Sequence, residues 1–216
     1  MPLVIGVDES GKGDFFGPLV IAALLASDDA APQLAELGVR DSKLISDNKL
    51  LQIDQKLREH FPHAIRIISP AEYNLMYARI KNLNVLLAQG HAWVIKTVLE
   101  QHHADLAISD QFGKPQLIEK ALTECGCLIR LEQTVRAESI PQVGAASILA
   151  RAEFVRQMKM LSESAGAPLP KGAGSPVDSA GAALVRAQGA AILDQVAKKH
   201  FKNYGRVISR AASLNK

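Results

Sequence analysis

The chain has 216 residues and a mass of 23.2 kDa, which is enough for one large α/β domain, with or without a small helical appendage, but not for two full-sized domains. It is 48% hydrophobic and 22% charged with a mean hydropathy of +0.05, which excludes the disordered, collagenous and fibrous classes. The longest apolar run, residues 18–26, is less than half the length of a membrane helix, and the N-terminus lacks a basic signal region. We therefore expect a cytoplasmic protein without membrane association.

Charge is distributed unevenly along the chain. Residues 1–150 contain 14 Lys and Arg against 18 Asp and Glu, whereas residues 151–216 contain 11 against 4. The two parts carry formal charges of −4 and +7. A basic C-terminal third is compatible with a polyanion partner such as nucleic acid, and equally with a solvated basic helix face.

Two cysteines, Cys125 and Cys127, form a single C-x-C motif. Two cysteines cannot make a disulfide framework, and this motif without another cysteine or histidine cluster is a poor zinc site. We expect both side chains to pack in the core.

Hydrophobic periodicity predicts strands that alternate with helices. In chain order, we expect a strand at 3–7, a strand at 19–25, helices at 31–37 and 46–61, a strand at 63–68, a helix from 70, a helix at 83–102, a strand at 106–109, a helix at 116–124, a strand at 127–131, a helix at 140–162, a linker at 165–176 and a helical region at 175–201. Ser69 and Pro70 look like an N-cap followed by proline at the first helical position. The alternation is typical of an α/β sheet.

Carboxylates recur where the predicted strands end: Asp8 and Glu9, then Asp110, then Glu138 a few residues past the strand at 127–131. Ligand sites in α/β folds gather at strand ends. Several carboxylates meeting there would repel one another unless cations lie between them, and such hard oxygen ligands suit Mg²⁺ or Mn²⁺. The alternative is that each carboxylate is a separate helix cap or surface charge.

Residues 6–12 match the phosphate-loop spacing G-x-x-x-x-G-K. Gly13 stands where that loop needs a Ser or Thr hydroxyl, and Asp8 and Glu9 would repel the phosphates, so the mechanism of the motif fails. The other interpretation is that Gly11 and Gly13 let the backbone approach a sugar-phosphate closely, while Lys12 supplies positive charge.

Further motifs extend over almost the whole chain. They are G-V-D-E-S-G-K-G-D at 6–14, F-G-P at 16–18, D-S-K at 41–43, N-L-N at 82–84, D-Q-F at 110–112, R-A-E-S at 136–139, A-A-S-I-L-A-R at 145–151 and L-P-K-G at 169–172. In identity and order they resemble the type 2 ribonucleases H, and within them ribonuclease HIII. The G-K-G turn and a Glu as fourth carboxylate look like ribonuclease HIII, whereas ribonuclease HII more often has G-R-G and an Asp.

The resemblance implies an α/β ribonuclease H-like fold, a mixed five-stranded sheet flanked by helices. We expect a ribonuclease H-like catalytic domain over residues 1–162, and a basic C-terminal linker and helical extension packed on it over 163–216. The implied catalytic and metal-binding residues are Asp8, Glu9, Asp110 and Glu138. Glu153 competes for the fourth position, but it follows S-I-L-A-R on a helix and reads as a surface residue.

The implied activity is a divalent-metal-dependent endoribonuclease that cleaves the RNA strand of an RNA/DNA hybrid with two Mg²⁺ or Mn²⁺ ions and leaves 5′-phosphate and 3′-hydroxyl ends. Incision at single embedded ribonucleotides, as in ribonuclease HII, and hybrid binding without turnover are the alternatives. The four carboxylates argue against hybrid binding without turnover, because their negative charge would repel the phosphates of a hybrid that is only bound. We expect a monomer.

Substrate contacts are expected from nine residues: Ser10, Gly11, Lys12, Gly13, Lys43, Asn82, Asn84, Ser147 and Lys171. Among these, Lys43 and Lys171 are candidate phosphate contacts with ordinary surface lysines as the alternative. Asn82 has an alternative role as the cap of the following helix.

Two departures from the family pattern affect substrate choice. Ribonuclease HIII usually carries an N-terminal platform domain, which we expect to be missing here. Type 2 enzymes that incise at one ribonucleotide use a tyrosine after an N-K-G-like turn, and the matching turn at 170–172 is followed by Ala173. We therefore expect little selection for single ribonucleotides, unless Tyr204 reaches the same place.

Overall fold

The computed structural model describes residues 1–39 and 45–213. Their contacts form two compact units. The first unit comprises residues 1–10, 20–66 and 82–153, and the second comprises residues 11–19, 67–81 and 154–216. The proposed division into residues 1–162 and 163–216 stays a prediction. Across the described ranges, no helix has the length and apolar character that crossing a membrane requires.

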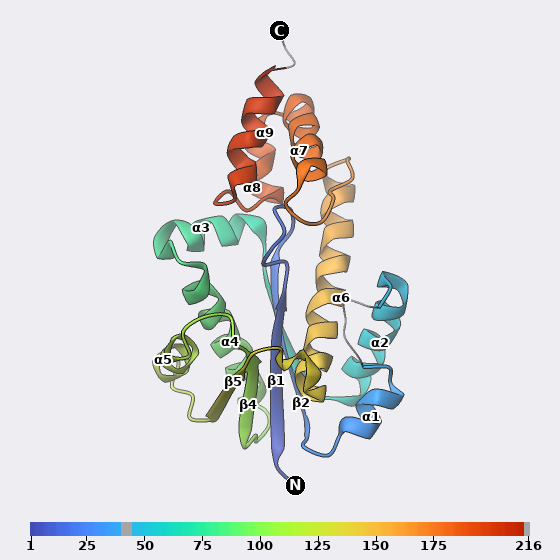
Figure 1. The fold of residues 1–216 in the computed structure, drawn as a ribbon, viewed down its shortest axis with the longest axis vertical. Helices are drawn as coiled ribbons and strands as arrows, with labels where there is room; N and C mark the ends of the chain where they lie inside the picture. The colour runs from blue at the N-terminus through green and yellow to red at the C-terminus, as the bar shows by residue number, and fades with distance from the viewer. Residues whose placement is uncertain (40–44, 214–216) are drawn as a thin grey trace. The chain divides into compact units, whose positions relative to one another are not determined.

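A mixed five-stranded sheet organises the first unit (Figure 1). The order β3-β2-β1-β4-β5 is formed by β1 (Leu3–Ser10), β2 (Leu19–Ser27), β3 (His63–Ile68), β4 (Leu106–Asp110) and β5 (Arg130–Thr134). β1 is antiparallel to β2 and parallel to β4, which is parallel to β5. β2 is buried along almost its whole length, as expected of a central strand covered on both faces. The predicted sheet is thus confirmed.

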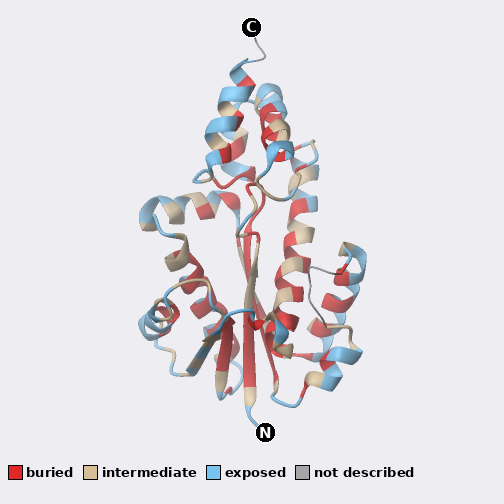
Figure 2. Ribbon diagram, in the orientation of Figure 1, coloured by how far each residue is buried: buried red, intermediate tan, exposed pale blue. Residues whose placement is uncertain are grey.

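Helices cover both faces of this sheet (Figure 1). They are α1 (Ala31–Glu36), α2 (Asp47–His60), α4 (Leu83–Leu99), α5 (Gln116–Glu124) and the first part of α6 (Pro141–Ser164). α6 packs directly on β1, because a Cβ atom at Gly6 would collide with the backbone of Gln142. α4 packs on the opposite face, where a Cβ atom at Gly90 would lie 2.6 Å from Cδ1 of Ile21. Figure 2 shows buried residues along β1 and β2 and on α4 and α6.

The second unit is mainly helical. It contains α3 (Pro70–Ile80), the end of α6, α7 (Ser175–Gln188), the short α8 (Leu193–Val196) and α9 (Lys202–Ser213). Ser69 caps α3 as predicted, because its Oγ accepts a hydrogen bond from the Glu72 amide at 3.2 Å. Phe15 and Phe16 are fully buried, and Phe16 forms an isolated β-bridge with Ala197.

β1 is longer than predicted. It continues past Val7 to Ser10, because its pairing with β2 persists until Ser10 lies opposite Val20. Asp8 and Glu9 therefore lie inside the strand, not after it. Successive side chains of a strand point to opposite faces, so these two carboxylates are separated by the sheet.

The region after α5 also differs from the prediction. β5 begins at Arg130, not at Cys127, because the Cys127 amide donates to the carbonyl oxygen of Leu122 at 2.9 Å and closes a turn. Leu128 is 98% exposed. Cys125 and Cys127 are half-buried, with Sγ atoms 3.3 Å apart, so the expectation that they pack in the core is wrong.

The C-terminal helical region is interrupted. α7 ends at Gln188 because Gly189 adopts a φ of 82°, a left-handed conformation that glycine favours at helix ends. A 3-10 turn, Ala190–Ile192, leads into α8, and α9 begins only at Lys202. The predicted continuous region to residue 201 is therefore corrected to α7 and α8, and α9 lies beyond it.

Candidate active site

Asp8 and Asp110 stand next to each other on neighbouring parallel strands. Val7 of β1 pairs with Ser109 of β4, so the register brings the following two residues together. Side chains in register project from the same face of a sheet. Gly6, two residues before Asp8, faces α6. Both carboxylates therefore project on the α6 face, at the carboxyl ends of the two strands, where sites of α/β sheets form.

Asp8 is in an environment that disfavours its charge. Burial raises the pKa of Asp8 from 3.8 to about 6, and the neighbouring Glu9 carboxylate adds to the rise. The hydroxyl of Ser147 on α6 and the Glu9 amide, which donates to Oδ1 at 2.8 Å, oppose the rise and orient the carboxylate. A cation placed beside Asp8 would favour the ionised form.

Glu9 is held on the α4 face by a buried histidine. Its Oε2 lies 3.1 Å from Nε2 of His91, which has no exposed surface. A carboxylate only accepts hydrogen bonds, so Nε2 carries the proton. The other ring nitrogen lies 3.1 Å from Oγ of Ser109, and the ring of Phe112 packs edge-on at 4.9 Å. These contacts fix the direction of the Glu9 side chain.

Glu138 is the middle residue of a short 3-10 turn, Ala137–Ser139, which contacts Asp110. The Ala137 amide donates to Oδ1 of Asp110 at 3.0 Å and ties the turn to β4. Arg136 precedes the turn in a left-handed conformation, with φ of 59°. Ala137 also belongs to an apolar cluster formed by Val4, Ile108, Ala137 and Val143. The turn therefore has both a polar and an apolar anchor.

Glu153, the competing carboxylate, has a structural partner. It is buried, with 9% exposure, and its Oε2 lies 2.9 Å from Nη2 of Arg58. Arg58 also bonds Asp54 one turn earlier on α2, at 3.0 Å. The expectation that Glu153 is a surface residue is wrong, because this ion pair joins α2 to α6. Glu153 thus has a structural role, and the choice of Glu138 as the fourth ligand stays a prediction.

The four carboxylates offer the chemistry of a divalent-metal site but not a preassembled cage. In the described ranges, no three His, Cys, Asp or Glu side chains converge on a single point. Asp8 and Asp110 share one face while Glu9 lies on the other. The donors are hard carboxylate oxygens, and the raised pKa of Asp8 marks negative charge that a cation would neutralise. These residues thus fit Mg²⁺ or Mn²⁺.

The G-K-G turn follows Ser10, the last residue of β1. Gly11 has a φ of 87°, and a Cβ atom there would collide with the carbonyl oxygen of Pro18, so this glycine is required by the fold. Gly13 is exposed and has open space around its Cα. Packing does not require a glycine at 13, which supports the interpretation that a ligand approaches the backbone there. Lys12 lies between them.

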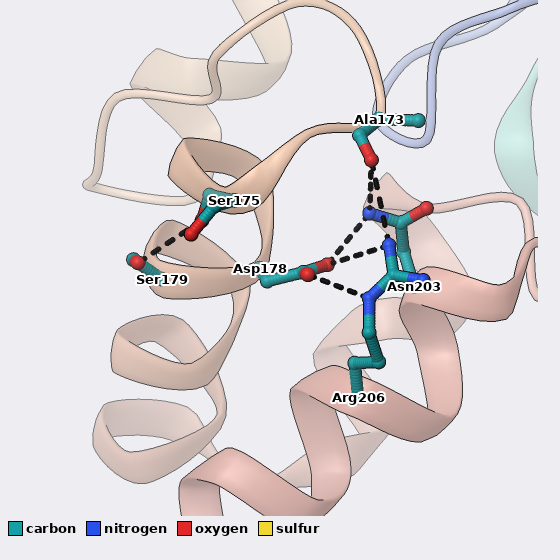
Figure 3. Close-up of polar contacts among 6 residues, drawn as sticks. All are labelled: Ala173, Ser175, Asp178, Ser179, Asn203 and Arg206. Atoms are coloured by element: carbon teal, nitrogen blue, oxygen red, sulfur yellow. Dashed lines mark hydrogen bonds and ion pairs between the residues drawn. The ribbon is translucent and has the colours of Figure 1, made fainter.

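Ala173, directly after the turn at 170–172, is anchored by α9 (Figure 3). The carbonyl oxygen of Ala173 accepts hydrogen bonds from Asn203 Nδ2 at 3.0 Å and Arg206 Nη2 at 3.4 Å. Both side chains also bind Asp178 of α7, each with a contact of 2.6 Å. Lys171 is exposed on this turn. The hydrogen bonds to Ala173 hold the backbone of the turn, and the turn presents the Lys171 side chain at the surface.

Tyr204, on α9, contacts Lys199. The ammonium group of Lys199 lies 5.3 Å from the centre of its ring, and Lys199 also pairs with Asp194 at 2.7 Å. Asn203, the residue before Tyr204, donates a hydrogen bond to the carbonyl oxygen of Ala173. The side chain of Ala173 is a methyl group. Whether Tyr204 serves in place of the missing aromatic residue stays a prediction to be tested.

Comparison with known proteins identifies the family. The sequence model of the family Ribonuclease HII matches residues 5–204. The chain belongs to the ribonuclease HII family. Two similar proteins are the ribonuclease HIII of Protochlamydia amoebophila, 40% identical over 95% of this chain and 68% of its own, and that of Chlamydia felis, 38% identical over 97% and 71%.

Solved structures agree with this assignment. Bst-RNase HIII in complex with Mn²⁺ matches with a TM-score of 0.92 and 33% identity, over 98% of this chain and 71% of the other. Aquifex aeolicus RNase H3 matches with a TM-score of 0.75 and 25% identity, over 92% and 72%. The chain is therefore a ribonuclease H enzyme with the ribonuclease H-like fold.

The remaining predicted residues of this ribonuclease H have mixed outcomes. The side-chain oxygen of Asn82 caps α4 by accepting from the amides of Asn84, at 3.0 Å, and Val85, so the capping alternative is confirmed. The side-chain amide group of Asn84 lies against Gly113, on the loop that follows Asp110. Lys43 lies outside the described residues.

Two polar residues were not singled out by the sequence. His91 holds Glu9, and its only sequence signal is a polar residue inside the apolar helix α4. Lys198 is buried in the second unit beneath the G-K-G turn. Nothing in its sequence context distinguishes it from the adjacent, exposed Lys199.

Proposed function

We propose that the chain is a divalent-metal-dependent endoribonuclease that cleaves the RNA strand of an RNA/DNA hybrid and leaves 5′-phosphate and 3′-hydroxyl ends. One observation carries the proposal: Asp8 and Asp110 stand in register on parallel strands of a chain that belongs to the ribonuclease HII family. The Mn²⁺ complex of the similar Bst-RNase HIII supports the choice of a divalent metal.

Asp8 and Asp110, on the α6 face, would hold the cations together with Glu138. Glu9, on the other face, would add negative charge from the end of the same strand. When bound, two divalent ions would activate a water molecule and stabilise charge on the leaving 3′ oxygen. The chain itself orients the acceptors. Ser147 and the Glu9 amide fix the Asp8 carboxylate, and the Ala137 amide fixes that of Asp110. His91 similarly restricts Glu9. Carboxylates held in this way lose little conformational freedom on binding a cation.

Recognition of the hybrid is assigned to the two turns. The open backbone at Gly13 allows close approach to the 2′-hydroxyl, the group that distinguishes RNA from DNA. Lys12 and Lys171 would contact phosphates, which position the duplex without reading its sequence.

A cleavage assay tests the proposal. A labelled uniform hybrid and a DNA duplex with one ribonucleotide are incubated with Mg²⁺, Mn²⁺ or EDTA. We expect metal-dependent cleavage of the hybrid, with product 3′ ends that a polymerase extends. Preferred incision at the single ribonucleotide would indicate the ribonuclease HII-like activity, and metal-independent binding without cleavage would indicate a pure binder.

The same cleavage assay, applied to two variants, tests whether Asp110 belongs to the active site. Asp110→Asn should abolish cleavage and retain hybrid binding, because an amide loses the charge and ligand strength of a carboxylate. Asp28→Asn, an exposed position just after β2, is the matched control and should cleave normally. Near-normal turnover of Asp110→Asn at saturating Mg²⁺ would contradict the assignment.

A further inference from the structure

Lys198 is a charged residue with no exposed surface. It lies between α8 and α9 in the second unit. Its ammonium group donates to the carbonyl oxygens of Gly17 at 2.7 Å, Asp14 at 2.8 Å and Phe16 at 3.5 Å. A lysine ammonium has three donors and no acceptor, so this arrangement satisfies it with backbone oxygens from one short loop.

The backbone around Lys198 holds the same loop. Its amide donates to the carbonyl oxygen of Phe15 at 2.8 Å, and the preceding residue, Ala197, forms the bridge to Phe16. Burial lowers the pKa of Lys198 to about 7, and the Asp14 carboxylate opposes this change. An apolar side chain would fill the space without that desolvation, so packing alone does not explain a lysine here.

The loop that Lys198 holds is the continuation of the G-K-G turn. The Asp14 amide donates to the carbonyl oxygen of Gly11 at 3.3 Å and closes that turn. Asp14 Oδ1 accepts from the Gly172 amide at 2.5 Å, and the Phe15 amide donates to the Gly172 oxygen at 2.9 Å. Asp14 thus joins the turn that carries Lys12 to the turn that carries Lys171.

We propose that Lys198 is a positioning residue for hybrid binding. It fixes the loop at 14–17, and through Asp14 it sets the relation between the two turns, so that Lys12 and Lys171 meet phosphates at a defined spacing. The inference rests on the proposed function. Its physical basis is preorganisation, because a backbone already fixed in the binding conformation loses less freedom when the duplex binds.

Lys198→Met tests the inference, with Asn74→Ala as the matched control. Asn74 holds the same segment from α3, by donating to the Ala197 oxygen and accepting from the Lys199 amide, both at 2.9 Å. We expect both variants to lower the melting temperature. Only Lys198→Met should raise the hybrid Kd and KM, by about tenfold, with kcat within about twofold of wild type.

A double-mutant cycle separates positioning from general loss of stability. If Lys198 acts through Lys12, then Lys12→Ala should cost much less affinity in the Lys198→Met background than in wild type. Additive effects on Kd, or a Lys198→Met variant whose KM matches that of Asn74→Ala, would overturn the inference.

Asp14→Ala gives the same answer if Lys198→Met does not fold. It removes the hydrogen bond to Gly172 and leaves the Lys198 contacts to backbone oxygens in place. A raised KM is expected, and an unchanged KM would overturn the inference. Wild-type cleavage of the hybrid is read in the same experiment, so failure of the proposed function is recognised separately.

Discussion

Asp8 places catalysis and folding stability in conflict. Its pKa is raised on folding from 3.8 to about 6, so its contribution to stability is present below pH 3.8 and is lost as the pH rises through 6. Without metal at pH 7, the ionised group therefore destabilises the fold, by up to about 3 kcal/mol. Asp8→Asn should abolish cleavage and yet raise the free energy of unfolding in EDTA, as measured by urea denaturation.

Two further measurements, of pH dependence and of Mg²⁺ dependence, test the prediction for Asp8→Asn. The stability difference from wild type should shrink as the pH falls from about 6 towards 3.8, because native Asp8 then becomes protonated. Mg²⁺ should raise the melting temperature of the wild type more than that of the variant, since only a ligand bound to the native state stabilises it. A variant less stable than wild type at pH 8 in EDTA would contradict the argument.

Substitutions of Glu138 and Glu153 should affect different properties, catalysis for Glu138 and stability for Glu153. Glu138→Gln should lower kcat severely, because Glu138 is assigned to the metal. Glu153→Gln should leave kcat near wild type and lower the free energy of unfolding by about 1 to 2 kcal/mol, since it weakens a partly exposed ion pair with Arg58. Steady-state kinetics and urea denaturation measure both. The reverse pattern would make Glu153 the fourth ligand.

The turn before α7 should govern which junctions are cut. The motif pattern predicts that Ala173 occupies the position where single-ribonucleotide enzymes use an aromatic ring. We therefore expect a run of four ribonucleotides to be cut faster than a single one. Ala173→Tyr should raise the rate on the single ribonucleotide by about fivefold or more, because stacking adds about 1 kcal/mol or more. The backbone anchor to Asn203 is unaffected by this change.

Initial rates on the two duplexes test this prediction, and Ala173→Leu is the control because it adds bulk without a flat ring. Equal rates of wild type on both duplexes would show that another residue makes the selection. Tyr204→Phe and Tyr204→Ala would then identify or exclude that tyrosine.

The charge difference between the two parts of the chain should appear in the salt dependence of binding. Lys202 and Arg210 are exposed two turns apart on one face of α9. Lys202→Gln with Arg210→Gln should weaken hybrid binding and reduce the slope of log K against log salt by about 1 for each phosphate that the variant no longer neutralises. Lys120→Gln, at an exposed position of α5, should leave the slope unchanged. An unchanged slope in the double variant would exclude this face of α9 from the interface.

Local pattern was sufficient for most of the helices and strands. β3 and α5 have the predicted bounds, and the Ser69 and Asn82 caps form as expected. Such features depend on periodicity and on side-chain contacts within a few residues. The motifs also predicted the family and the sheet. The start of β5 could not be predicted in this way, because a hydrogen bond from Cys127 back to α5 competes with strand pairing.

The sequence by itself determined the alternation of helices and strands, the family and the candidate carboxylates, because these follow from local spacing and residue identity. Only the tertiary structure decided how those side chains are directed. Strand alternation separates Glu9 from Asp8, register joins Asp8 to Asp110, and packing of α2 on α6 pairs Glu153 with Arg58. The buried roles of His91 and Lys198 likewise arise from contacts with residues far apart in sequence, whose geometry no local pattern encodes.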